Sequence, residues 1–217
     1  KNSIFNLFAT YELDLNFKKF TESNLYLSIE KVTNDTFLKI FDPHIQDQIL
    51  KPTNYDNLKN ELKISLKEND YNFESGIKSF ENLQKANNDK YEYVFPYYNF
   101  SKILSEDKFN GRINFVSSGD NILNNTNVLK STITNDLEYK SEDYILSGGL
   151  RNFFEIDLRN LNSVGKNNSD YKSSPQVEFM SIINLNSSFP LLKQTDKDIN
   201  YLTPKVLLRI NPSDMKN

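Results

Sequence analysis

The segment FNLFATYELDLNF, residues 5–17, shows the pattern that decides the fold. Its odd-numbered positions are almost all large and apolar, whereas most of the residues between them are polar, including Glu12 and Asp14. Successive side chains of a strand point to opposite faces. This stretch therefore predicts a strand with one apolar and one polar face.

The same alternation recurs along the whole chain. We predict about ten strands from it, in the segments 4–18, 25–32, 58–67, 70–80, 91–101, 112–118, 127–140, 143–161, 176–191 and 200–211. Several reach the roughly 9–11 residues that a tilted strand needs to cross a bilayer. The predicted fold class is all-β, with antiparallel up-and-down strands forming part of a transmembrane outer-membrane β-barrel.

Composition supports a sheet with one wet face. Apolar residues make up 37% of the 217 residues and aromatic residues 13%, against roughly 45–50% apolar in ordinary soluble domains. The net charge of −3 is spread along the chain, which argues against a nucleic-acid partner, because such proteins carry a basic patch or stripe. The sequence has no cysteine and no apolar run long enough for a transmembrane helix.

The connections between the predicted strands differ in length. Short ones are expected near 19–24, 67–70 and 140–143, and longer polar ones near 33–57, 81–90, 119–126 and 162–175. Alternating short and long connections are typical of outer-membrane barrels. A soluble β-sandwich, which also shows alternating faces, is the alternative.

No residue pattern predicts catalysis, a cofactor or a metal. His44 is the only histidine and lies in a polar segment between Asp42 and Asp47, where too few ligands of the right type surround it. Gly148-Gly149 is not followed by a helical pattern, so a strand bend is expected there and not a phosphate loop. The charged positions Glu12, Asp14, Glu155, Asp157 and Arg159 are predicted to line a hydrated lumen, solvated or paired with charges of a neighbouring strand.

Three segments resemble a known family, and they occur in its order. The first, LSIEKVTNDTFLKIF at 27–41, has a strand that ends in a turn followed by a short aromatic stretch, at Val32, Asn34, Asp35, Phe37 and Leu38. The second, YEYVFPYYNFSK at 91–102, has aromatic residues around a proline, at Tyr93, Pro96 and Tyr98. The third, YLTPKVLLR at 201–209, contains Leu202, Pro204 and Lys205. Together they are similar to the barrel of the lipopolysaccharide-assembly protein LptD family, also called the organic solvent tolerance family.

The resemblance implies an outer-membrane translocon of a Gram-negative cell and not an enzyme. Residues 1–217 would be a segment of the barrel domain, with the N-terminal jelly-roll domain and the remaining strands outside it, and this segment alone is not expected to close. The implied partners are lipopolysaccharide, an LptE-like lipoprotein plug, outer-membrane lipids and, through the jelly-roll domain, an LptA-like periplasmic bridge. A porin or other channel barrel, or a soluble carbohydrate-binding β-sandwich, remains the alternative.

Overall fold

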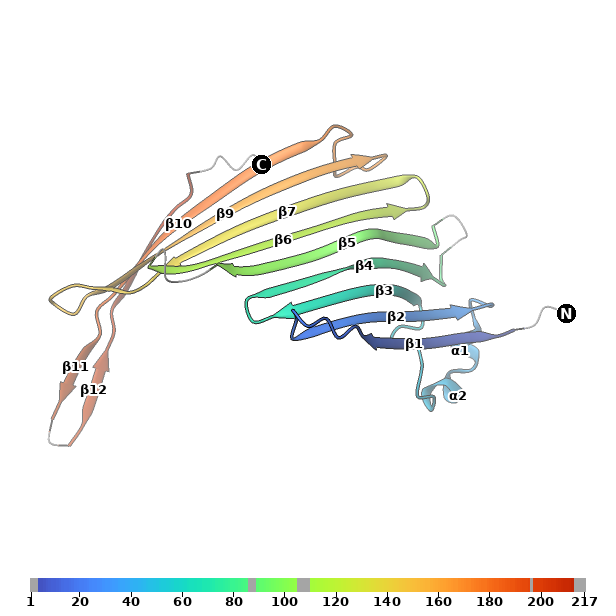
Figure 1. Ribbon diagram of the computed structural model, residues 1–217, viewed down its shortest axis with the longest axis horizontal. Helices are drawn as coiled ribbons and strands as arrows, with labels where there is room; N and C mark the ends of the chain where they lie inside the picture. Colours follow the sequence, from blue (N-terminus) through green and yellow to red (C-terminus); the bar gives the residue numbers. More distant parts are fainter. Residues whose placement is uncertain (1–3, 86–88, 105–109, 196, 213–217) are drawn as a thin grey trace. The chain divides into compact units, whose positions relative to one another are not determined.

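The chain forms an antiparallel up-and-down sheet with very little helix (Figure 1). The computed structural model describes residues 4–85, 89–104, 110–195 and 197–212. The strands are β1 (Asn6–Asp14), β2 (Glu22–Val32), β3 (Asn57–Glu68), β4 (Tyr71–Asn82), β5 (Tyr91–Leu104), β6 (Gly111–Asn124), β7 (Val128–Ser141), β8 (Tyr144–Ile145), β9 (Arg151–Lys166), β10 (Gln176–Ser188), β11 (Leu191–Gln194), β12 (Ile199–Leu202) and β13 (Lys205–Ile210).

The long strands pair in the order β1-β2-β3-β4-β5-β6-β7-β9-β10-β13. In the described part of the chain β1 pairs with β2 alone and β13 with β10 alone, so the sheet is open and does not close into a barrel. β2 to β7 and β9 to β10 have 11–16 residues each, far above the mode of about 5–6 for globular strands.

Each of the ten predicted segments contains one of the strands in this pairing order. Two of the segments, however, are interrupted in the structure. The segment 143–161 is interrupted, because β8 turns back onto the start of β9 through a turn that contains Gly149 with a φ of 87°. Gly148 and Gly149 thus lie in a hairpin turn. The segment 200–211 is split into β12 and β13, and β12 pairs with the unpredicted β11.

Two of the predicted connections beyond residue 118 are wrong, while the one predicted as long near 162–175 is long, at residues 167–175. The polar stretch 119–126 is mostly strand, because β6 continues to Asn124 and leaves only residues 125–127 as its connection to β7. Its polar side chains are satisfied by the next strand: Thr132 donates a hydrogen bond to Asp120, and Ser131 to Asn121. The connection near 140–143 is longer than predicted, since it holds β8.

Two compact units divide the chain. The first comprises residues 1–100, 118–133 and 162–176, and the second comprises 101–117, 134–161 and 177–217. In the first unit the β3–β4 ladder runs without a bulge from Asn57↔Asn82 to Glu68↔Tyr71. Only Asn69 and Asp70 connect these two strands, and this short connection fixes the register of the pair.

A long, interrupted hairpin ends the second unit. β10 pairs with β13 from Ile183↔Ile210 to Ser188↔Lys205, and β11 with β12 from Leu191↔Leu202 in the same register. Between them Phe189 N–H donates to the carbonyl of Pro204 at 3.0 Å. Pro190 and Pro204 have no N–H to donate, so the ladder is broken at the two prolines and resumes beyond them.

A small buried core lies at one end of the first unit, under two short helices, α1 (Phe37–Ile40) and α2 (Asp42–Gln46). We call residues 33–56, which contain both helices, the cap. The core comprises Val32, Leu38, Ile45, Leu58 and Leu83. Neither helix of the described residues has the length and apolarity to cross a membrane.

Candidate functional site

The two faces of the first unit differ in chemistry, and the strand register produces the difference. Tyr11, Leu27, Leu62 and Ile77 lie opposite one another across β1 to β4 and form an apolar row. Residues paired in this way share one face of a sheet. The row is open to solvent, since Tyr11 is 55% exposed and Leu62 40%.

A groove of about 510 Å³ lies on this apolar face. Its lining includes Leu27, Ile29, Leu62, Ile77, Tyr93 and Phe95. The Phe95 side chain is 65% exposed at its wall. A groove with this lining can accept an apolar chain, but it offers few polar groups to a sugar.

The opposite face carries charges in register. Ser28, Glu61 and Lys78 form one row, and Glu12, Tyr26 and Lys63 form the next. Glu61 is only 7% exposed, yet its oxygens lie 2.7 Å from the Lys59 ammonium and 3.4 Å from that of Lys78. It also accepts a hydrogen bond from the Tyr97 hydroxyl at 2.8 Å.

Strand β5 exchanges its faces at Pro96. Tyr93 and Phe95 line the apolar groove, whereas Tyr97, two residues beyond Phe95, reaches Glu61 on the charged face. The Lys78 ammonium lies 3.8 Å from the centre of the Tyr97 ring. The peptide bond between Phe95 and Pro96 is cis.

The ring of Tyr98, two residues after Pro96, packs against Gly119 of β6. A Cβ atom at Gly119 would lie 2.5 Å from Cε1 of the Tyr98 ring. Both residues line a cavity of about 330 Å³ together with Asp120 and Thr132. Glycine at this position therefore makes room for the ring.

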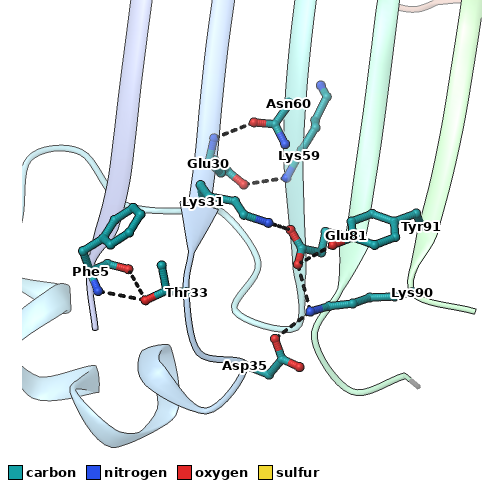
Figure 2. Close-up of polar contacts among 10 residues, drawn as sticks. All are labelled: Phe5, Glu30, Lys31, Thr33, Asp35, Lys59, Asn60, Glu81, Lys90 and Tyr91. Carbon is teal, nitrogen blue, oxygen red and sulfur yellow. Dashed lines mark hydrogen bonds and ion pairs between the residues drawn. The ribbon is translucent and has the colours of Figure 1, made fainter. Parts of the chain in front are cut away.

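Four charged side chains form an alternating chain at the end of the first unit that carries the cap (Figure 2). Lys31 lies 2.8 Å from Glu81, Glu81 lies 2.9 Å from Lys90, and Lys90 lies 2.6 Å from Asp35. The Tyr91 hydroxyl donates a further hydrogen bond to Glu81 at 3.3 Å. We call these five residues the charge chain.

The inner and outer members of the charge chain differ in exposure. The side chains of Glu81 and Lys90 are 6% and 10% exposed, while those of Lys31 and Asp35 are 45% and 47% exposed. Burial by itself lowers the pKa of Lys90, but hydrogen bonds to Asp35 and Glu81 and their negative charges outweigh it, so the pKa is raised. The charge chain thus presents one cation, Lys31, and one anion, Asp35, to its surroundings.

The first of the three segments in which the resemblance was noted, residues 27–41, folds around this end. Val32 and Leu38 are buried in the core below the cap, and Phe37 packs against it. The Asn34 side chain accepts a hydrogen bond from Thr36 N–H at 2.9 Å and closes the turn into α1. With Asp35 bound to Lys90, all five positions of the motif lie together.

Strands β2 and β3 separate next to the cap, and side chains replace their ladder bonds. Regular pairing ends at Ser28↔Glu61. Beyond it, the amide of Asn60 accepts from Glu30 N–H at 2.9 Å, and the Glu30 carboxylate accepts from Lys59 N–H at 2.7 Å (Figure 2). The backbone N–H groups of Glu30 and Lys59 therefore both have acceptors where the two strands separate.

The residues predicted to line a lumen take different partners. Glu12 accepts a hydrogen bond from Asn24 across the β1–β2 ladder, while Asp14 accepts one from Asn16 N–H in the following turn. In the second unit Arg159 binds both oxygens of Asp136, at 2.6 and 2.9 Å.

The two carboxylates of β9 have different surroundings. Glu155 accepts a hydrogen bond from Asn186 and lies 3.5 Å from the Lys140 ammonium. Asp157 shares a cavity of about 290 Å³ with Glu138 and Arg159. Phe154 packs against Tyr139, with the ring centres 5.5 Å apart, whereas Leu158 lines the same cavity as Asp157 and Arg159.

The third of these segments, residues 201–209, lies in the interrupted hairpin of the second unit. Leu202 is opposite Leu191 and is 63% exposed. Pro204 accepts the bond from Phe189 described above, and Lys205 begins β13 opposite Ser188. These three residues contribute to the hairpin and not to either charged cluster.

Glu61, Glu81 and Lys90 are functional candidates that the sequence did not predict. Glu61 and Glu81 sit in strands with many Lys and Glu residues, and nothing in that composition distinguishes a buried carboxylate from a solvated one. Lys90 stands in a polar connection directly before the second motif. Its partner Asp35 lies in the first motif, and this proximity of two motifs was the one available signal.

Within the described ranges, no three His, Asp or Glu side chains gather into a group that could hold a metal. His44 lies in the last turn of α2. Comparison with known proteins gives no further guide: no family model matches the chain, and a search of curated proteins found no match.

Proposed function

We propose that this chain is a segment of an outer-membrane β-barrel of the LptD type, which inserts lipopolysaccharide into the outer leaflet. In this proposal the apolar face meets the lipid and the charged face borders a hydrated lumen. The lipoprotein plug, the periplasmic bridge and lipopolysaccharide itself are its proposed partners. The proposed role is translocation and not chemical conversion.

The observation that carries the proposal is the apolar row across β1 to β4, which stays exposed while the opposite face holds paired charges. In water such a row would be unfavourable, because exposed apolar area costs about 25 cal/mol per Å² relative to burial. In a bilayer it is the expected outer surface of a barrel strand. Strand lengths of 11–16 residues support the same proposal.

In a membrane, the sheet would have to close into a barrel so that its edge strands are paired. Unpaired backbone groups at a strand edge cost several kcal/mol each in lipid. β1 and β13 both have such an edge in the described residues. We therefore expect further strands to complete the ring in the cell.

Single cysteines test the membrane position, because the chain has none of its own. They are placed in β9 of the intact protein, made free of other thiols, and probed in membranes with a lipid-soluble quencher and a water-soluble thiol reagent. Cysteines at 154, 156 and 158 should report lipid, and cysteines at 155, 157 and 159 should report water. If none of them reports lipid, the chain is a soluble sheet protein.

The transport role needs a separate test. Depletion of the intact protein should leave newly made lipopolysaccharide in the periplasm or inner membrane, and photoreactive groups at Glu155 or Asp157 should crosslink to it. Normal surface lipopolysaccharide after depletion would contradict the proposed role. Ion conductance without such crosslinks would favour a porin or other channel.

A further inference from the structure

The apolar groove and the charge chain are adjacent parts of one surface. Ile29, Ser79 and Tyr93 line the groove, and Lys31, Glu81 and Tyr91 each lie two residues away from them on the same strands. Residues two apart on a strand share a face and lie about 7 Å apart. The stacked rings of Tyr91 and Tyr93, 6.2 Å apart, show this continuity directly.

The charges at the end of the groove balance one another. The charge chain holds two ammonium groups and two carboxylates, so it carries no net charge. Its exposed members are the Lys31 ammonium and the Asp35 carboxylate (Figure 2). A ligand with several phosphates would need a cluster of free cations instead.

We infer that the groove and the charge chain together form a seat for one zwitterionic phospholipid that bears a primary ammonium group. An acyl chain lies in the groove between Leu27, Leu62 and Phe95. The phosphate lies at Lys31 and the headgroup ammonium at Asp35. Buried Glu81 and Lys90 hold these two exposed groups in place. The inference rests on the proposed membrane position, and it adds a lipid that is bound and not transported.

Native mass spectrometry of the intact protein provides the test. The protein is released from mild-detergent micelles that contain equal amounts of phosphatidylethanolamine and phosphatidylglycerol. We expect one retained phosphatidylethanolamine per protein, with a preference of about two- to five-fold over phosphatidylglycerol, the range of an exposed ion pair. Equal retention of the two lipids would overturn the inference.

Three variants separate the parts of the seat. Asp35→Asn should abolish the preference between the lipids, because only the ethanolamine ammonium uses this carboxylate. Lys31→Gln should reduce retention of both lipids, since both carry the phosphate. Leu62→Trp should fill the groove and abolish retention of both lipids; since Leu62 is 40% exposed, we expect the larger side chain to be tolerated by the fold.

Lys67→Gln is the matched control, because Lys67 pairs with Glu22 away from the groove and its side chain is 53% exposed. It should retain lipid as the unchanged protein does. If Asp35→Asn keeps the preference, the seat is wrong. If the β9 cysteines report lipid while no selective retention is found, the seat fails and the membrane proposal stands; if they report only water, the membrane proposal itself fails.

Discussion

The ammonium group of Lys90 lies 2.6 Å from the carboxylate of Asp35, although 55 residues separate them in the sequence. One residue belongs to the cap between β2 and β3, and the other immediately precedes β5. Through Glu81 the contact extends to Lys31 on β2. This chain of charges therefore fastens the cap to the ends of three strands.

Replacing Lys90 by Met should loosen the cap. Glu81 and Asp35 would each lose a charged donor, and hydrogen bonds to charged groups contribute about 1.5–3 kcal/mol each. We expect amide hydrogen exchange in residues 33–40 of the intact protein to accelerate about tenfold to a hundredfold. Lys67→Met is the control, because its partner Glu22 is 56% exposed and an exposed pair contributes less than about 1 kcal/mol. Unchanged exchange in Lys90→Met would show that the contact does not hold the cap.

The same contact should lose its effect at alkaline pH. The pKa of Lys90 is raised in the folded protein above its ordinary value of 10.5, so the folded state holds this proton more tightly than the unfolded state. The stabilisation is complete below pH 10.5 and declines as the pH rises through the folded pKa. The difference in unfolding free energy between the unchanged protein and Lys90→Met should be constant below pH 10.5 and shrink as the pH is raised above it. A difference that stays constant above pH 10.5 would exclude the ammonium charge as its source.

Leu38 should be the main apolar contact of the cap. Its side chain is fully buried, and Leu→Ala substitutions at such sites cost about 2–5 kcal/mol. We expect Leu38→Ala to make residues 33–56 sensitive to brief proteolysis while the strands stay protected. Ile49→Ala provides the comparison, because Ile49 is 99% exposed; equal sensitivity of the two variants would contradict the packing described.

Tyr97→Phe tests the buried carboxylate on the charged face. The variant removes the hydroxyl that binds Glu61 but keeps the ring beside Lys78, and we expect a loss of about 1–3 kcal/mol in chemical denaturation. Tyr26→Phe, on the same face, keeps its ring 5.7 Å from Lys63 and should change stability far less. Similar losses in both variants would mean that the Glu61 contact has no special weight.

Arg159→Lys should have a small, salt-dependent effect. Lysine cannot reproduce the two-pronged contact with Asp136, but the Arg159 side chain is 54% exposed, so we expect a loss below about 1 kcal/mol. The difference should fall further in about 1 M salt, where surface charges are screened. A larger loss that does not respond to salt would mean that the pair is shielded from water.

The prediction of strands succeeded wherever one face is apolar. In β1 (Asn6–Asp14) and again in β9 the alternation coincides with a strand, because the geometry of an extended chain has a period of two. The predicted strand to Phe17 is too long, since the backbone turns at Asn16, which has a φ of 52°. The prediction of strands failed in 119–126, where polar side chains resemble a loop but are paired across β6 and β7. It also missed the turn between β8 and β9, since the alternation of apolar and polar residues does not show where the chain reverses direction.

The sequence by itself determined that the chain is a set of long antiparallel strands with an apolar and a charged face, because side-chain alternation is a local property. Only the tertiary structure decided which charges are buried. Glu81 and Lys90 look like any other charged residues in the sequence, and they leave water only because three strands and the cap meet at one end. Contacts over such separations depend on register and chain reversal, which no local pattern contains.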